Sequence, residues 1–508
     1  MILIASAKYL PNEFQMELGK LPPSFLPIGA KRLYEYQAAL FKPLGEKIVL
    51  SLPKSFILDE IDKDKLESLK IEILSVPDEL SLGESIVYCL NMNLPLKESV
   101  RILHGDTYFN ALDFYENSLV ITQVENNYDW EFFDSSYVSA NNIVASKDSI
   151  VCGYFEIANP YYFIQSILRF HYSYILGIKE YSKAYPFFVV ENKSWVDLGF
   201  VASYFNFKKQ LTTQRAFNNL QIKNGYFVKS SSLDNKILGE IEWFKRFPLE
   251  LSLNVPRFVE LENASYKTEY LYLNTLQELF VFGRLPHFVW DRIFKNLKSF
   301  LKELHSFKAE GQVDFDFCKK TQERLCVFLK ENNFSLDSSW EAFGLKVSLE
   351  KMLLDINNAI SDNASQVFIH GDFCFSNIMY DFKANDIKVF DPRGVDFSGN
   401  ITPFGDFRYD VAKLAHSVLG LYDFIIAGFF KLNVESQKIN FEIKIPPLIQ
   451  SVQAAFLEIF SDYDKRELYA LLVHLFLSML PLHSDNKRRQ MALFANAFRL
   501  YFDFIRMQ

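Results

Sequence analysis

The stretch that decides the fold reads VFIHGDFCFSNIMYDFKANDIKVFDPRG and spans residues 367–394. A short apolar run ends in the triplet His370-Gly371-Asp372, and Asn377 follows a few residues later on the same loop. Two further apolar runs, separated by the polar residues 383–386, predict a β-hairpin that ends at Asp391. Such a hairpin would bring Asn377 and Asp391 to one place although they are distant in sequence.

The residue types in this stretch suit phosphoryl transfer. That reaction needs a carboxylate to orient the attacking hydroxyl, and carboxylate and amide oxygens to hold Mg²⁺ against the phosphates. Asp372 suits the first role, and Asn377 and Asp391 suit the second. The structural alternative is a loop aspartate that caps a helix, followed by an aspartate at the end of a hairpin.

The spacing H-G-D-x4-N followed by a strand-final Asp resembles the aminoglycoside phosphotransferase and choline kinase branch of the protein-kinase-like fold. The resemblance implies two lobes, a small α+β N-lobe and a mostly helical C-lobe, with ATP as substrate. It implies that His370 orients the catalytic loop. It also matches Asp410, in RYDVAKLAHS, to the helix-start aspartate that braces this loop, although a simple acid at a helix N-terminus is an alternative.

Upstream residues fit the same resemblance. Lys229, in GYFVKSSS, lies on an expected strand where a phosphate-pairing lysine would lie. Glu240, in the following helix GEIEWFKRF, would orient it, with Glu242 as the competing candidate. A surface lysine and a surface glutamate are the alternative. No glycine-rich loop precedes Lys229.

Strands alternate with helices in the first part of the chain, which predicts a parallel α/β sheet. The expected strands are residues 1–5, 47–52, 69–76 and 100–104, and the expected helices are residues 33–41 and 84–90. In the second part we expect strands at 225–230 and 258–261 around a helix at 236–246. From about residue 275 helices dominate, interrupted only at 366–369, 378–380 and 387–390.

The N-terminal segment LPIGAKRLYEYQ resembles the sugar-phosphate nucleotidyltransferases, which have a Rossmann-like (GT-A-like) mixed-sheet fold. The resemblance implies that Asp106, after a strand, and Asp197, in WVDLGF, are Mg²⁺ ligands. It matches SLGESIVYCL, with Gly83 and Glu84, to the helix that contacts the nucleotide base. Two such carboxylates would offset charge while a phosphate monoester attacks the α-phosphate of a nucleoside triphosphate.

The N-terminal segment departs from that family in its phosphate-binding loop. No G-x-G-x-R glycines follow the first strand, and Pro23 replaces the usual lysine. Lys20, Lys8 or Lys31 could substitute for that lysine. A variant branch found in capsule and lipopolysaccharide gene sets is similar in its opening to FQMELGKLPP.

Composition limits the partners. The net charge of −8, without a basic tract, argues against a nucleic-acid partner. The five cysteines form no CxxC or Cys/His spacing, so the sequence favours neither zinc nor disulfides and fits a reducing cytoplasm. The longest apolar stretches are too short to span a membrane. A homo-oligomer remains compatible with the sequence.

Together these patterns predict an α/β multidomain enzyme. The expected domains are a nucleotidyltransferase-like domain at 1–222 and a small-molecule kinase domain at 223–508, with its N-lobe at 223–275 and its C-lobe at 276–508. The kinase would phosphorylate a small alcohol with ATP. The first domain would couple that phosphate to a nucleotide, with CTP favoured, giving an NDP-activated precursor for capsule or another surface polysaccharide. The alternatives are a kinase with a degenerate nucleotide-binding domain, and a non-catalytic scaffold or regulator.

Overall fold

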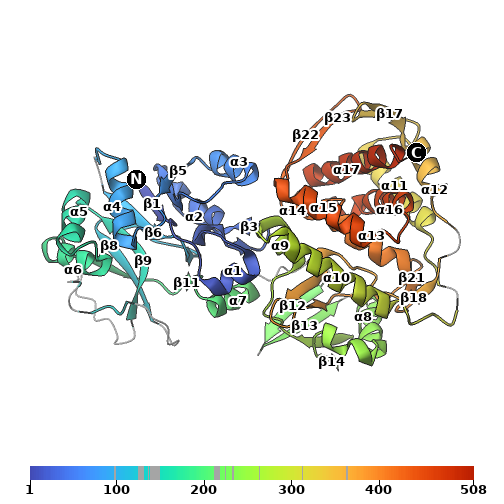
Figure 1. Ribbon diagram of the computed structural model, residues 1–508, viewed down its shortest axis with the longest axis horizontal. Coiled ribbons are helices and arrows are strands. Elements are labelled where there is room, and N and C mark those ends of the chain that lie inside the picture. The colour runs from blue at the N-terminus through green and yellow to red at the C-terminus, as the bar shows by residue number, and fades with distance from the viewer. Residues whose placement is uncertain are drawn as a thin grey trace. The chain divides into compact units, whose positions relative to one another are not determined.

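The computed structural model describes residues 1–96, 99–123, 131–134, 137, 149–210, 218–223, 225–231, 234–262, 264–311, 313–361 and 364–507. The chain divides into two compact units, Met1–Leu211 and Thr212–Gln508 (Figure 1). We expected a boundary near residue 222, but β12 (Asn218–Lys223) already pairs with β13 (Tyr226–Ser231) in the second unit.

A seven-stranded sheet in the order β10-β8-β9-β6-β1-β4-β5 organises the first unit. Its strands are β1 (Ile2–Ala5), β4 (Ile48–Pro53), β5 (Ile71–Val76), β6 (Val100–His104), β8 (Ser118–Gln123), β9 (Ser149–Ile157) and β10 (Phe188–Glu191). The strands expected from the alternating pattern correspond to β1, β4, β5 and β6, and they are parallel. In addition, β9 runs antiparallel to β6 and β8, so the sheet is mixed, as the resemblance to the nucleotidyltransferases implied.

Helices accompany the strands of this unit, as the alternating pattern predicted. They are α1 (Asn12–Leu18), α2 (Leu33–Phe41), α3 (Glu60–Ser68), α4 (Leu82–Met92), α5 (Pro160–Arg169), α6 (Tyr174–Ala184) and α7 (Val201–Gln210). Leu3 and Ile102 of the sheet and Ile86 of α4 are fully buried in one core. Two short ribbons, β2 (Pro27–Ile28) with β3 (Lys31–Arg32) and β7 (Thr107–Phe109) with β11 (Trp195–Asp197), complete the unit.

The second unit has two lobes. Its small lobe is an antiparallel sheet, in the order β12-β13-β15-β14, together with α8 (Asp234–Arg246). The remaining strands of that sheet are β14 (Phe258–Leu261) and β15 (Ser265–Glu269).

The larger lobe is mostly helical. Its helices are α9 (Leu276–Phe282), α10 (His287–Leu304), α11 (Phe317–Asn332), α12 (Leu349–Asn357), α13 (Phe407–Val418), α14 (Tyr422–Ile426), α15 (Pro447–Ile459), α16 (Lys465–Ser478) and α17 (Lys487–Ile505). The expected hairpin is confirmed as β19 (Ile378–Asp381) paired with β20 (Asp386–Val389). A mixed-sheet α/β unit followed by a two-lobed, kinase-like unit is the fold class that the sequence predicted.

The expectation that only three strands interrupt the helices of the large lobe is wrong. A four-stranded sheet contains β16 (Ser339–Ala342), β17 (Leu345–Ser348), β22 (Phe430–Glu435) and β23 (Lys438–Ile443), and β18 (Gln366–Phe368) pairs with β21 (Phe404–Asp406). In FKLNVE and KINFEI apolar and polar residues alternate, which is the period of a half-exposed strand. None of the helices in the described ranges is long and apolar enough to cross a membrane.

Candidate active sites

The loop that carries Asp372 is held by buried contacts on both sides. Phe373 stacks on Phe300 of α10 with ring centroids 5.7 Å apart, and Phe375 stacks on Trp290 at 5.8 Å. Alternate apolar residues thus anchor the loop to α10 and leave Asp372 at the surface of the lobe, where its side chain is 37% exposed. A substrate can therefore reach this carboxylate.

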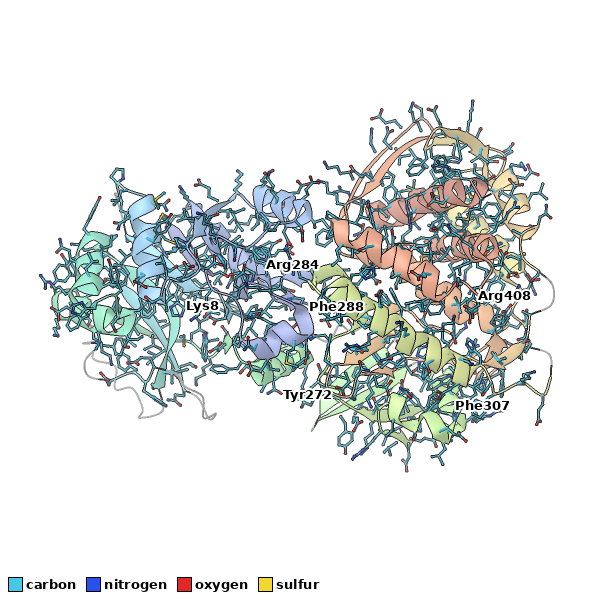
Figure 2. All side chains as sticks on the ribbon, viewed as in Figure 1. Lys8, Tyr272, Arg284, Phe288, Phe307 and Arg408 are labelled. Carbon is cyan, nitrogen blue, oxygen red and sulfur yellow. The ribbon has the colours of Figure 1, made fainter. Side chains whose placement is uncertain are left out.

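Asp410 braces the same loop from α13. Its carboxylate accepts hydrogen bonds from the backbone N–H groups of His370 and Gly371, each at 2.8 Å. Gly371 has φ +74°, a conformation that glycine adopts without steric cost. Arg408, labelled in Figure 2, fixes the start of α13 through an ion pair with Asp406 at 2.6 Å. The arrangement matches the bracing role expected for Asp410.

The hairpin brings Asp391 back to the loop that carries Asp372 and Asn377. The amide nitrogen of Asn377 donates to the backbone carbonyl of Asp372 and to its Oδ2, both at 3.0 Å. The backbone N–H of Phe390 donates to the carbonyl of Asn377 at 3.1 Å, which places Asp391 directly beyond the paired strands. His370 Nε2 lies 3.1 Å from the carbonyl of Phe390, so this histidine links the loop to the hairpin end.

Lys229 and Glu240 form a buried ion pair. Lys229 Nζ donates to the two carboxylate oxygens of Glu240 at 2.8 and 2.7 Å and also contacts Asp391. The hydroxyl of Tyr266 donates to Glu240 at 2.7 Å. Glu242, the competing candidate, is 39% exposed and lies 3.9 Å from Arg246. The structure therefore joins Lys229 to Glu240 and to the hairpin end.

Two glycines allow α8 to approach the hairpin end. A Cβ atom on Gly394 would lie 2.1 Å from the backbone carbonyl of Gly239, and Gly394 has φ +64°. Because Glu240 follows Gly239, this close backbone contact sets the depth at which Glu240 meets Lys229.

Lys413 is a site residue that the sequence analysis missed. Its ammonium lies 2.6 Å from Asp372 Oδ1. Partial burial would raise the pKa of Asp372, but the charge of Lys413, helped by those of His370 and Arg393, holds that pKa well below its ordinary value. In the same way, burial raises the pKa of Asp391, the charge of Lys229 lowers it, and the result is a pKa below the ordinary value. The sequence signal for Lys413 was its position three residues after Asp410 on one helix, because side chains three residues apart lie on the same face of a helix.

Asp106 and Asp197 converge in the first unit. Thr107 and Asp197 are direct partners in the β7–β11 ribbon, and the backbone N–H of Leu198 donates to the carbonyl of Asp106 at 2.9 Å. A Cβ atom on Gly199 would lie 2.9 Å from Asp106 Oδ2 and 3.0 Å from Asp197 Oδ1. The two carboxylates thus border one point, which only a glycine leaves open. Burial raises the pKa of Asp106.

The loop that carries Asp106 is tied to residues 24–37, which include the LPIGAKRLYEYQ segment. Ser24 Oγ donates to the carbonyl of Gly105 at 3.1 Å, and Gln37 Nε2 donates to the carbonyls of Gly105 and Thr107, both at 3.0 Å. Through Gln37, the segment that suggested the family therefore supports the strand end that carries the first carboxylate.

The other N-terminal candidates have local contacts. Lys20 Nζ lies 4.1 Å from the ring centroid of Tyr9, and Lys31 Nζ lies 5.5 Å from that of Tyr36. A Cβ atom on Gly83 would lie 2.0 Å from the carbonyl of Tyr172, so Gly83 allows close packing of α4. Glu84 accepts from the N–H of Ser81 at 2.8 Å in a capping box. A role in binding nucleotide remains a prediction for all four.

Both sites offer the hard oxygen ligands that Mg²⁺ prefers. The described residues contain no group of three or more His, Cys, Asp or Glu that could hold a metal ion. Each site instead provides two candidate ligands. They are the Asp391 carboxylate with the Asn377 amide oxygen in the second unit, and the carboxylates of Asp106 and Asp197 in the first. Such pairs fit Mg²⁺ that takes its remaining oxygens from water and phosphates.

Residues 216–424 match the model of the phosphotransferase enzyme family. The search of curated proteins found no match. The family match supports phosphotransferase activity in the second unit, and the chain is an enzyme.

Solved structures similar to the chain fall into two groups. The nucleoside-diphosphate-sugar pyrophosphorylase from Vibrio cholerae is 14% identical, with a TM-score of 0.34, over 41% of this chain and 100% of that chain. The CTP:phosphocholine cytidylyltransferase from Streptococcus pneumoniae is 16% identical, with a TM-score of 0.33, over 42% and 98%. An aminoglycoside-3'-phosphotransferase of type VIII is 17% identical, with a TM-score of 0.30, over 52% and 96%.

Proposed function

We propose that the chain is a bifunctional kinase and nucleotidyltransferase that activates a small alcohol in two steps. The second unit transfers the γ-phosphoryl group of ATP to the alcohol. The first unit couples the new phosphate to a nucleotide from an NTP, with CTP favoured, and releases pyrophosphate. The observation that carries the proposal is the convergence of Asp372, Asn377 and Asp391 with the Lys229–Glu240 pair.

Each kinase residue has a chemical task in this proposal. Glu240 holds Lys229 where its ammonium can pair with nucleotide phosphates. Asn377 and Asp391 would hold Mg²⁺, whose charge offsets that of the phosphates. Asp372, kept ionised by Lys413, orients the acceptor hydroxyl and takes its proton as the oxygen attacks the γ-phosphorus. The bond from the γ-phosphorus to the bridging oxygen breaks, and ADP leaves.

In the first unit, Asp106 and Asp197 would hold Mg²⁺ beside the triphosphate. An oxygen of the acceptor phosphate attacks the α-phosphorus of the NTP. The bond from the α-phosphorus to the oxygen that bridges to the β-phosphorus breaks, and pyrophosphate leaves. This assignment is supported by the closeness of both carboxylates to one point, the position that a Cβ atom on Gly199 would occupy. The product would be an NDP-linked building block, made in the cytoplasm and suited to capsule or other surface polysaccharide synthesis.

The proposal is tested by following the two leaving groups separately. The full chain is incubated with Mg²⁺, ATP and each NTP against a panel of polyols, sugars and amino alcohols. We expect ADP with one class of acceptor and pyrophosphate once its phosphate has formed. ADP without pyrophosphate for every acceptor and NTP would exclude the second activity, and the absence of ADP throughout would count against the kinase.

A kinase with a degenerate N-terminal unit is the second candidate. The observation that favours it is the local use of Gly83 and Glu84, which pack and cap α4. Together with the missing glycine-rich loop, this leaves the triphosphate without an evident cradle among the residues matched to the nucleotidyltransferase family. The same assay separates the two candidates, because only the bifunctional enzyme releases pyrophosphate.

A further inference from the structure

Four cations gather around the proposed base, and we call them the basic cluster. They are Lys320 and Arg324 on α11, Arg393 in the loop after β20, and Lys413 on α13. All four are partly buried and keep some exposed surface. Lys320 and Arg393 lie over the ring of Phe397, and Arg324 follows Lys320 by one turn of α11. The charges of Arg393, Arg324, Lys413 and Asp372 all affect the pKa of Lys320.

The basic cluster is short of carboxylates. Lys413 pairs with Asp372 at 2.6 Å. Across the described ranges, no carboxylate forms an ion pair with Lys320, Arg324 or Arg393. Lys320 Nζ instead donates to the hydroxyl of Tyr409 at 3.0 Å and lies 3.8 Å from the ring centroid of Phe397.

The two arginines also bind neutral groups. Arg393 donates from Nε to the carbonyl of Val395 at 2.8 Å, and its guanidinium lies 5.2 Å from the ring centroid of Phe397. Arg324 donates to the carbonyl of Ser478 at 3.3 Å. Aromatic faces and carbonyls hold these cations in place without neutralising them.

The excess positive charge is unfavourable in the protein alone. Burial and the charges of Arg393, Arg324 and Lys413 bring the pKa of Lys320 well below its ordinary value. Burial and the charge of Arg393 also lower the pKa of Arg324. Clustered like charges of this kind are stabilised when an anion binds among them.

The basic cluster lies on the side of Asp372 rather than on that of Lys229. Lys413 pairs with Asp372, and a Cβ atom on the adjacent Gly371 would lie 2.6 Å from Cβ of Arg393, whereas Lys229 contacts Glu240 and Asp391. Lys229 and Asp391 are the residues proposed to serve the phosphates of ATP. The basic cluster is therefore placed to serve the other substrate.

We propose that the acceptor alcohol carries an anionic group, a phosphate or a carboxylate, which Lys320, Arg324 and Arg393 bind while its hydroxyl meets Asp372. The inference rests on the proposed kinase function and narrows its acceptor. A cationic amino alcohol is disfavoured, because it would add a fifth positive charge to the basic cluster.

Binding of a simple anion tests the basic cluster directly. Inorganic phosphate is titrated calorimetrically into the full chain saturated with Mg²⁺ and a non-hydrolysable ATP analogue, so that the nucleotide site is filled. We expect Lys320→Met to weaken phosphate binding about tenfold, the scale of one lost charge-assisted hydrogen bond. The matched control is Lys319→Met, an exposed lysine on the same helix, with affinity unchanged.

Unaltered phosphate affinity in Lys320→Met, or no phosphate binding to the wild type, would overturn the inference. Failure of the ATP analogue itself to bind would instead count against the proposed function.

Acceptor preference gives a second measure. ADP formation is compared for glycerol and glycerol 3-phosphate, for glucose and glucose 6-phosphate, and for choline and ethanolamine. We expect the anionic member of a pair to react faster, with a KM that rises in Lys320→Met while the KM for ATP stays unchanged. Faster reaction of a neutral or cationic acceptor would refute the anionic acceptor and leave the kinase function standing.

Discussion

At the scale of single residues, the ion pair between Lys413 and Asp372 controls the protonation of the proposed base. The folded-state pKa of Asp372 lies below its ordinary value. The carboxylate of the wild type is therefore ionised at any pH above the ordinary pKa of an aspartate. Without Lys413, the largest influence that lowers this pKa is lost while partial burial still raises it. We expect Lys413→Met to move the acid limb of the kcat/KM profile to higher pH by about one unit or more.

The measurement is a kcat/KM profile for ADP formation from about pH 3 to about pH 8, a range that begins below the ordinary pKa values of carboxyl groups. Lys413→Arg is the control, because it keeps the charge beside Asp372 and should keep the acid limb near its wild-type position. An acid limb that stays in place in Lys413→Met would show that this ion pair does not set the ionisation of the base.

Glu240 and Glu242 provide a matched pair on one helix. Glu240 is fully buried against Lys229, whereas Glu242 is 39% exposed. We expect Glu240→Gln to lower kcat/KM for ATP at least about tenfold, because Lys229 loses a buried charged partner. Glu242→Gln should leave kcat/KM within about twofold, as expected for an exposed pair. Equal effects of the two substitutions would contradict the assignment of Glu240.

At the scale of elements, the contact between Gly239 and Gly394 keeps α8 close to the hairpin end. In Gly394→Ala the new Cβ would meet the carbonyl of Gly239 at 2.1 Å, and α8 must move outward and carry Glu240 away from Lys229. We expect a lower thermal unfolding midpoint together with weaker ATP binding.

Gly399→Ala separates steric contact from backbone strain. Gly399 also has a positive φ, +87°, but nothing lies within 4 Å of its Cβ position. We expect this variant to lose only about 1 kcal/mol of stability, the cost of a left-handed alanine, and to bind ATP normally. If both variants bind ATP like the wild type, the glycine contact does not position Glu240.

Sequence patterns revealed the elements and residues whose relationships are local. The hairpin followed from two apolar runs around a polar turn, and it explains how the end of the hairpin at Asp391 returns to Asn377. The basic cluster could not be found in this way, because α11 and the loop at Arg393 are far apart in sequence and meet only through tertiary packing. The antiparallel direction of β9 was also hidden, since side-chain alternation does not encode strand direction.

At the scale of the whole molecule, the two units should lose their activities independently. Asp372→Asn removes the proposed base, so ADP formation should fall at least about a hundredfold, while pyrophosphate release from a pre-phosphorylated acceptor continues. Asp106→Asn removes one carboxylate beside Gly199, so pyrophosphate release should fall while ADP formation continues. Asp113→Asn, at an exposed position of the first unit, is the control and should alter neither activity.

Leaving-group assays on the purified variants, together with circular dichroism to show that each remains folded, measure this separation. Two independent losses would mean that each unit holds a complete site, because a carboxylate removed from one unit cannot affect chemistry that depends only on the other. If either substitution abolishes both ADP and pyrophosphate formation in a folded protein, the two-site model is wrong, and the chain must use its two units for a single reaction.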